Sequence, residues 1–310
     1  MKCNLCPERC DIQLGERGKC FVRINREEKI VIDDWGAITN IAIEPIEKKP
    51  IYHFKPNLKT LSIGGYFCNF SCDYCQNYTV SQRDCSNKVK HFLPQEIVDL
   101  AKEKEVDAVC MTYNEPTILF EYLIQLAKCC HQNNLYFILK TNGSLCNSYW
   151  KQVVKVCDAI NIDFKGGIKD YKDICGVSYH FYYQILNNIE WAIKSDTHVE
   201  ISVPVYPHVK GHEYWVGDLL KILDFNVPVH LLKVFPANKA MHWIATTDKT
   251  MFALKNIFKQ KLKYVFISNL FNSKNKGIRD TYYKDILVVK REKLQSVVIR
   301  NDLANLIFKK

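Results

Sequence analysis

Three cysteines lie within eight residues in the segment CNFSCDYC, at residues 68–75. Cys68, Cys72 and Cys75 are separated by three and two residues, a spacing at which thiolates can cap three corners of a cubane iron–sulfur cluster. Proteins that only carry electrons usually supply a fourth cysteine. Three ligands leave one iron open, and an open metal position can bind and activate another molecule. The alternative is a zinc site with a distant fourth ligand.

A second group of cysteines stands at the start of the chain. Cys3, Cys6, Cys10 and Cys20 have the spacing C-x2-C-x3-C-x9-C, which indicates a metal site. Zinc bound by four thiolates would be a closed structural site and would help a short segment to fold. An auxiliary iron–sulfur cluster is the alternative. The spacing favours neither, and we expect zinc.

The other seven cysteines have a simpler interpretation. They stand at positions 85, 110, 129, 130, 146, 157 and 175, mostly within apolar helix or strand patterns, where buried thiols serve as small apolar residues. Cys85 and Cys175 fall in predicted loops and are candidates for reactive thiols. MKCNLCPERC lacks the apolar run of a signal peptide, so we expect a cytoplasmic protein with reduced thiols.

The elements that position these residues follow an alternating pattern. Short apolar runs rich in β-branched and aromatic residues predict strands at 61–67, 107–113, 135–140, 158–164, 198–205 and 229–235, with a possible seventh at 263–268. Amphipathic stretches between them predict helices at 94–104, 116–134, 147–156, 180–194, 213–223 and 247–260. Such alternation implies parallel strands joined by right-handed crossovers.

The number of these units sets the fold class. Six or seven are too few for a closed eightfold barrel, so we expect an α/β fold with a partial (β/α)6 barrel. Residues 1–58 would form a small cysteine-rich unit, 59–240 the barrel core and 241–310 a short helix and strand extension. Alternating apolar residues in ILVV and VVIR predict a small hairpin near the end of the chain.

The cysteine motif resembles that of the radical S-adenosylmethionine superfamily, which also places an aromatic residue, here Tyr74, before the third cysteine. CxLCPxxC with GxxGxCxVR, IEPIEKKPIYHF at 43–54 and LSIGGYFCNFSCDYCQN are similar to the radical enzyme of the AmmeMemoRadiSam group. This branch is close to pyruvate formate-lyase activating enzyme. The likeness covers roughly residues 1–240, and the tail at 281–310 lacks the second cysteine-rich module typical of the group.

The resemblance implies a [4Fe–4S] cluster whose open iron is chelated by the amino and carboxylate groups of S-adenosylmethionine. Reductive cleavage of that cofactor gives methionine and a 5′-deoxyadenosyl radical, which removes a hydrogen atom from a substrate. The resemblance also implies a low-potential electron donor, flavodoxin or ferredoxin.

Motifs at successive strand ends carry the cofactor contacts that the resemblance implies. These are Tyr74 of the cluster motif, Asn114 and Glu115 of TYNEP toward the amino group, Thr141 and Asn142 of TNG, Asp163 of DFKG toward the ribose hydroxyls, and Lys165 toward the carboxylate. Some relatives hold a monovalent cation through an acidic residue where this chain has Lys140, and we hypothesise that its ammonium replaces that cation. The alternatives are that Asn114 and Glu115 cap the next helix and that Lys140 faces solvent.

Five further polar residues each have two interpretations. His208 and His230, in or after later strands, would face a substrate or serve as hydrogen-bonded core residues. The segment EPIEKKPIYHF is interpreted as a lead-in that packs against the barrel. Lys48, Lys49 and His53 within it are the alternative, as side chains that approach the active site.

Charge and hydropathy restrict the function. The net charge of +10 fits a solvated, lysine-rich surface, and a basic face for nucleic acid or an acidic protein is the alternative. No apolar run is long enough to span a membrane.

We expect hydrogen abstraction from a protein, peptide or small molecule, with RNA modification or a non-catalytic Fe–S or zinc module as alternatives. A binding module has no need of Glu115, Asp163 and Lys165 at three strand ends.

Overall fold

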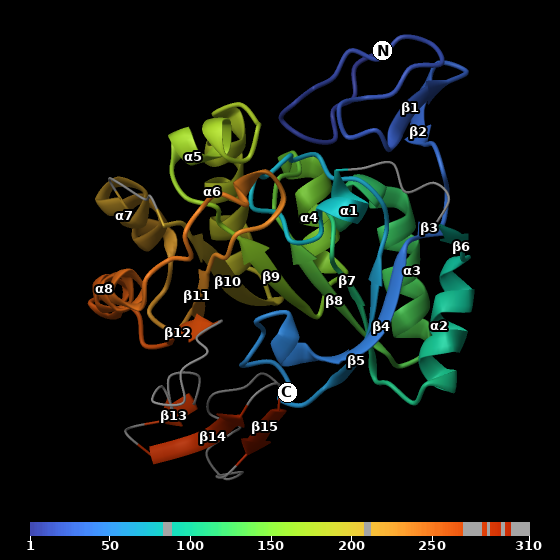
Figure 1. The fold of residues 1–310 in the computed structure, drawn as a ribbon. Helices are drawn as coiled ribbons and strands as arrows, with labels where there is room; N and C mark the ends of the chain where they lie inside the picture. Colours follow the sequence, from blue (N-terminus) through green and yellow to red (C-terminus); the bar gives the residue numbers. More distant parts are fainter. Residues whose placement is uncertain (83–88, 208–211, 269–280, 284–285, 293–294, 299–310) are drawn as a thin grey trace.

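The structure is a computed structural model, and it describes residues 1–82, 89–207, 212–268, 281–283, 286–292 and 295–298. An eight-stranded sheet forms its centre, in the order β12-β11-β10-β9-β8-β7-β5-β4 (Figure 1). The strands are β4 (Asn40–Pro45), β5 (Lys59–Gly64), β7 (Ala108–Met111), β8 (Tyr136–Thr141), β9 (Ala159–Asp163), β10 (His198–Val205), β11 (Val229–Lys233) and β12 (Val265–Ser268). Among the described residues β4 and β12 end the order, so the sheet is an open, partial barrel as predicted.

Seven of these strands run parallel, and β4 is added antiparallel to β5 at one edge. β12 is the seventh parallel strand that the sequence suggested. The parallel strands are largely buried, which explains why they are rich in apolar residues, although β5, β9 and β10 also bury polar side chains. β4 is different because several of its side chains are exposed, and the sequence did not predict that it would extend the sheet.

Helices cover the outer face of the sheet (Figure 1). They are α2 (Pro94–Glu103), α3 (Phe120–Gln132), α4 (Asn147–Lys155), α6 (His180–Ile193), α7 (His212–Ile222) and α8 (Asp248–Lys259), all close to their predicted bounds. α2 shows why they form: Pro94 occupies its first turn, the Leu93 amide donates to Glu96 at 2.6 Å, and one apolar side is buried. Three short helices, η3 (Pro116–Leu119), α1 (Tyr78–Ser81) and α5 (Ile168–Asp173), lie in the loops.

The lead-in segment packs against the barrel, as the sequence predicted, and lies at the amino-terminal ends of the strands (Figure 1). It contains η1 (Ile46–Lys48), and its apolar side chains pack on the barrel strands. Lys48 and Lys49 both pair with Glu44, the latter at 2.5 Å, and the His53 ring lies 4.3 Å from that of Tyr264. None of Lys48, Lys49 and His53 lines the cavity described below, so the alternative that they approach the active site is wrong.

A buried carboxylate ties this lead-in to the sheet. Glu200 of β10 accepts hydrogen bonds from the amides of Tyr52 at 2.8 Å and His53 at 2.6 Å. The rings of His198 and His230 hydrogen-bond to the same carboxylate at 2.9 and 2.5 Å. His230 is therefore a hydrogen-bonded core residue, as one of its two interpretations held. His208 lies outside the described residues.

Glu200→Gln is expected to lower the free energy of unfolding by about 3 kcal/mol, because an amide cannot satisfy four buried donors. Urea denaturation measures the change. The matched control is Glu190→Gln on α6, whose side chain is 42% exposed and pairs with Lys194 one helical turn away. Its effect should stay within about 0.5 kcal/mol, and equal losses in the two variants would contradict the structural role assigned to Glu200.

Small units flank the barrel at both ends of the chain. At the start, β1 (Arg23–Arg26) and β2 (Lys29–Ile32) form an antiparallel hairpin, and β3 (Ala37–Ile38) pairs with β6 (Lys90–His91). At the end, β13 (Thr281–Tyr283), β14 (Ile286–Glu292) and β15 (Gln295–Val298) form an antiparallel sheet. The pairing of β14 with β15 confirms the predicted hairpin. No helix in the described residues has the length and apolar character needed to cross a membrane.

Candidate active site

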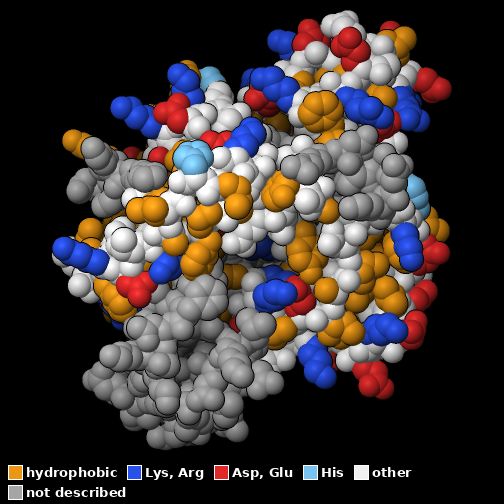
Figure 2. Space-filling model, viewed as in Figure 1, with side chains coloured by type: hydrophobic (Ala, Val, Ile, Leu, Met, Phe, Trp, Pro, Cys, Tyr) orange, Lys and Arg blue, Asp and Glu red, His pale blue; other side chains and the backbone are white. Residues whose placement is uncertain are grey.

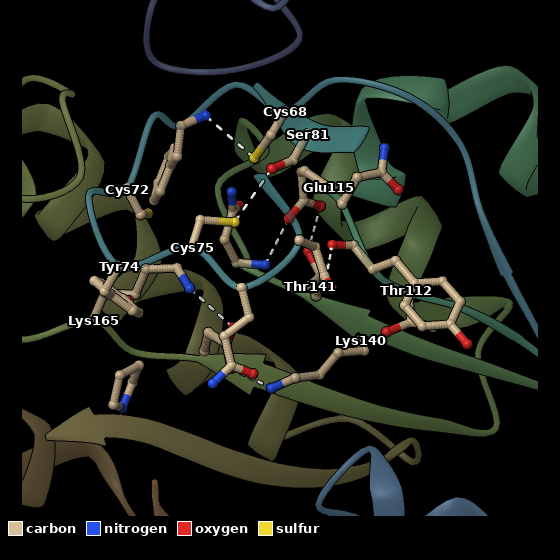
Figure 3. A pocket seen from close by; sticks show the side chains of 18 of the residues that line it. Cys68, Cys72, Tyr74, Cys75, Ser81, Thr112, Glu115, Lys140, Thr141 and Lys165 are labelled. Carbon is tan, nitrogen blue, oxygen red and sulfur yellow. Dashed lines mark hydrogen bonds and ion pairs between the residues drawn. The ribbon is translucent and has the colours of Figure 1, made fainter. Parts of the chain in front are cut away.

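A cavity of about 230 Å³ opens at the carboxyl ends of the parallel strands (Figure 3). All eleven side chains proposed from the sequence for the cluster and the cofactor line it: Cys68, Cys72, Tyr74, Cys75, Asn114, Glu115, Lys140, Thr141, Asn142, Asp163 and Lys165. They come from the loops and ends of four strands, β5, β7, β8 and β9. The fold therefore gathers into one place residues that are about a hundred positions apart in the chain.

The loop after β5 carries the three cysteines and is held by side-chain bonds to its backbone. Asn114 donates from Nδ2 to the carbonyl oxygens of Phe67 at 2.8 Å and Tyr66 at 3.1 Å. Gln82 donates to the carbonyl of Cys72 at 2.8 Å. Phe67, directly before Cys68, has a positive φ of 57°, so the loop turns sharply where the first thiol begins.

Asn114 has a second feature that matters for a bound ligand. Its Oδ1 atom is buried and finds no hydrogen-bond partner among the described residues. A buried acceptor without a donor is costly and usually marks a missing partner. Because Asn114 lines the cavity, a ligand with a donor group fits beside it.

Glu115 is almost fully buried, with 1% of its surface exposed. Its Oε1 accepts from the Thr117 hydroxyl at 2.6 Å, the Thr117 amide at 3.1 Å and the Thr141 hydroxyl at 2.6 Å, and its Oε2 accepts from the Asn142 amide at 2.7 Å. The carboxylate therefore caps η3, as the alternative interpretation held for Glu115, whereas Asn114 bonds to the cluster loop instead. Since Oε2 has one donor, it keeps room for a further one.

These contacts also affect the ionisation of Glu115. Burial raises the pKa of the carboxyl group, although the hydrogen bonds from Thr117, Thr141 and Asn142 oppose the shift. A cationic ligand at Oε2 would favour the charged form.

Asp163, at the end of β9, lies between two lysines. Its Oδ1 pairs with Lys140 of β8 and its Oδ2 with Lys165 at 2.9 Å. Burial disfavours the charged carboxylate, yet the two ammonium groups outweigh it and lower the pKa of Asp163 to about 2. Lys140 also donates to Asn161 at 2.5 Å, and its side chain is only 17% exposed. The alternative of a solvent-facing Lys140 is therefore wrong.

The sequence did not single out the rest of the lining. Gln76, Asn77 and Gln82 follow the cysteines, and Lys233 and Val234 stand at the end of β11. The sequence did contain one signal for Lys233 and Val234: they stand at the end of a predicted strand, where the chemistry of this fold is expected.

The donor set fits a cubane cluster better than a single ion. Within the described part of the chain, no three His, Cys, Asp or Glu side chains are gathered closely enough to hold one metal ion. A cubane does not require that, because each thiolate binds a different iron. Among the described residues, the Cys68 sulfur contacts the Phe70 amide at 3.3 Å and Asn69 Oδ1 at 3.9 Å, and the Cys75 sulfur contacts the Ser81 hydroxyl at 3.2 Å.

The four N-terminal cysteines line a second, smaller cavity of about 20 Å³ together with Asn69 of the cluster loop. Burial raises the pKa of Cys3, Cys6 and Cys20, so without a bound cation these thiols stay protonated. The unit contacts the barrel through the Cys146 amide, which donates to the Leu5 carbonyl at 2.9 Å. The choice between zinc and an auxiliary cluster stays a prediction.

Comparison with known proteins defines the class. A sequence model of the radical SAM superfamily matches residues 62–216, which is half of the chain. The chain is also 31% identical over 281 residues to an uncharacterized protein of Methanocaldococcus jannaschii, covering 87% of this chain and 81% of that protein. The chain therefore belongs to the radical SAM superfamily.

Solved structures share the fold. A radical SAM methyltransferase from Sphaerobacter thermophilus is similar with a TM-score of 0.54 at 10% identity, over 73% of this chain and 70% of that one. SuiB from Streptococcus suis is similar with a TM-score of 0.50 at 13% identity, over 73% of this chain. This chain spans about half of SuiB, 52% of its length. At these identities the likeness is one of fold.

Proposed function

We propose that this protein binds a [4Fe–4S] cluster through Cys68, Cys72 and Cys75 and reductively cleaves S-adenosylmethionine there. The bound cofactor supplies the radical that removes a hydrogen atom from a substrate. The observation that carries the proposal is the cavity of about 230 Å³, which joins three thiols to the acidic and basic side chains of the neighbouring strand ends.

The residues of this chain would bind and orient the cofactor. Oε2 of Glu115 and Oδ1 of Asn114 both have acceptor capacity that suits an ammonium group. Asp163 has an ionised carboxylate that can accept hydrogen bonds from ribose hydroxyls, and Lys165 suits a carboxylate. Holding these groups in fixed positions is the main contribution of the protein to the reaction.

The proposed reaction needs an electron donor and a substrate. We propose a flavodoxin or ferredoxin as electron donor, and a protein, peptide or small molecule as substrate, as in the activating-enzyme branch. Among the side chains coloured on the face shown in Figure 2, Lys and Arg are spread among Asp and Glu and form no distinct basic patch for RNA. We also propose that Cys3, Cys6, Cys10 and Cys20 bind zinc, which would draw these thiols closer together than they lie in the described residues.

Anaerobic reconstitution with iron and sulfide tests these proposals. With dithionite and S-adenosylmethionine added, the protein should produce 5′-deoxyadenosine, and metal analysis should find about four irons and one zinc per chain. About eight irons would assign the N-terminal cysteines to a second cluster instead. A reconstituted, iron-loaded protein that forms no 5′-deoxyadenosine would contradict the proposed activity.

Lys140 gives a separate prediction about cations. Because its ammonium already pairs with Asp163, we expect cofactor affinity and cleavage to change less than about twofold between sodium, potassium and a bulky organic cation. Lys140→Met removes the ammonium group and leaves the Asp163 carboxylate without this partner. That variant should have low activity without potassium and higher activity when potassium is added. A strong potassium dependence of the wild-type protein would contradict the replacement hypothesis.

A further inference from the structure

Side chains join the cluster loop directly to the turn after β8. Asn69, which follows the first cysteine of the loop, is half-buried and uses both polar atoms of its side-chain amide. Its Nδ2 donates to the Ser144 hydroxyl at 2.8 Å, and its Oδ1 accepts from Nδ2 of Asn142 at 2.9 Å. Oδ1 of Asn142 in turn accepts from the Ser144 amide at 3.1 Å. The three residues therefore form a closed ring of hydrogen bonds between the two segments.

This ring continues into the proposed cofactor site through the backbone of Asn142. The Asn142 amide donates to Oε2 of Glu115 at 2.7 Å, and this oxygen is the one proposed to accept from the ammonium group of the cofactor. Ser144 is fully buried and Asn142 almost so, which keeps solvent from competing for these bonds. Asn69 thus connects the loop that would hold the open iron to the carboxylate that would bind the amino group.

Asn69 itself has no place in the active-site cavity, because it does not belong to the lining. It lines the smaller cavity of the N-terminal cysteines, but its amide is bonded to Asn142 and Ser144. Two roles are left, one in stability alone and one in positioning. A ligand that contacts both the iron and Glu115 binds best when their separation is already fixed, since binding then costs less ordering.

We propose that Asn69 is a positioning residue that fixes the turn after β8, and with it Glu115, relative to the cluster loop, and so sets the affinity for S-adenosylmethionine. This inference rests on the proposed function for the identity of the cluster and the cofactor. Ser144 also lies outside the lining, and each bond of the ring orients the next, so Asn69 and Ser144 act as one unit.

The test is the affinity of the reconstituted protein for S-adenosylmethionine, measured by anaerobic equilibrium dialysis. Asn69→Leu has a similar volume without polar atoms. It should retain the iron content and bind the cofactor about tenfold more weakly, which is the lower end of the loss caused by removing outer-shell partners of metal sites. The cofactor concentration that changes the electron paramagnetic resonance signal of the reduced cluster should rise by the same factor.

A conservative variant separates positioning from packing. Asn69→Asp keeps an acceptor for Asn142 and can accept from the Ser144 hydroxyl, so it should recover most of the affinity. The matched control is Asn133→Leu. Asn133 is also half-buried and uses both amide atoms, with the Cys129 carbonyl at 2.8 Å and Lys102 at 2.6 Å, but it lies before β8. That variant should keep the wild-type affinity.

Ser144→Ala opens the ring from its other side and should weaken binding in the same sense. Because the ring acts as one unit, Asn69→Leu with Ser144→Ala should bind no more weakly than Asn69→Leu alone. Strictly additive losses would overturn the inference, as would wild-type affinity in an iron-loaded Asn69→Leu or equal losses in Asn69→Leu and Asn69→Asp.

If Asn69→Leu does not retain its cluster, Ser144→Ala decides, because Ser144 lies outside the cluster loop. Unchanged affinity in that variant would overturn the inference. Failure of the proposed function is recognised separately, because the iron-loaded wild-type protein would then bind no S-adenosylmethionine.

Discussion

Cys72→Ala is expected to abolish the formation of 5′-deoxyadenosine. With two thiolates left, the cluster loses one of the three bonds that hold it, and the open iron no longer has a fixed place in the cavity. Loss of outer-shell partners of metal sites alone typically costs about 10- to 100-fold in activity, so loss of a ligand should exceed roughly a hundredfold. The measurement is 5′-deoxyadenosine per chain after anaerobic reconstitution, together with the iron content.

The control for Cys72→Ala is Cys110→Ala. Cys110 is equally buried and lies on the neighbouring strand β7, where it packs under Ile46, Ile51 and Phe54. That variant should lose stability but keep its iron and its activity. Undiminished 5′-deoxyadenosine formation by Cys72→Ala would rule out the assigned cluster, and equal losses in both variants would indicate a general effect of truncation.

The sequence predicted the barrel because its parallel strands are buried on both faces. β10 was predicted at its observed bounds, His198–Val205, because apolar residues alternate along HVEISVPV, although all eight residues are buried and the polar ones among them were not recognised as core. The site was predictable for a related reason: in this fold the chemistry lies at strand ends, and each motif directly follows a strand. All eleven candidate residues accordingly line one cavity.

The sequence did not predict what depends on contacts between distant segments. Nothing in NIAIEP shows that β4 pairs with β5, because edge strands are half exposed and carry a weak pattern. Lys140 has a side chain that usually faces solvent, and only the neighbouring strand β9 supplies the Asp163 carboxylate that holds it inside. The hydrogen bonds from the Ser71 and Asp73 amides to the Cys175 and Ile174 carbonyls likewise form only after the chain has folded.

Asp163→Asn is expected to have the second-largest effect. It removes the carboxylate that pairs with both Lys140 and Lys165, whose side chains are mostly buried. Breaking a buried ion pair by removing one partner costs about 3–5 kcal/mol, because the remaining charge is left without compensation. Affinity for S-adenosylmethionine should fall as well, if Asp163 accepts hydrogen bonds from the ribose. Urea denaturation and equilibrium dialysis measure the two effects.

The difference in unfolding free energy between the wild type and Asp163→Asn should also depend on pH. The pKa of Asp163 in the folded protein is about 2, below its ordinary value of 3.8. A carboxyl group whose pKa is lowered by folding contributes its full stabilisation at pH values above its ordinary pKa. This contribution is lost as the pH falls toward the folded-state pKa of about 2. The stability gap between wild type and Asp163→Asn should therefore be constant near neutral pH and should narrow below about pH 4.

A double variant separates the two roles of Asp163. Lys140→Met removes one of the two ammonium groups that Asp163→Asn leaves unpaired, so Asp163→Asn with Lys140→Met should recover part of the lost stability. It should not recover cofactor affinity, because the carboxylate proposed to bind the ribose is still missing. If affinity returned together with stability, Asp163 would act only through the ion pairs, and the contact with the cofactor would have to be assigned to another residue of the cavity.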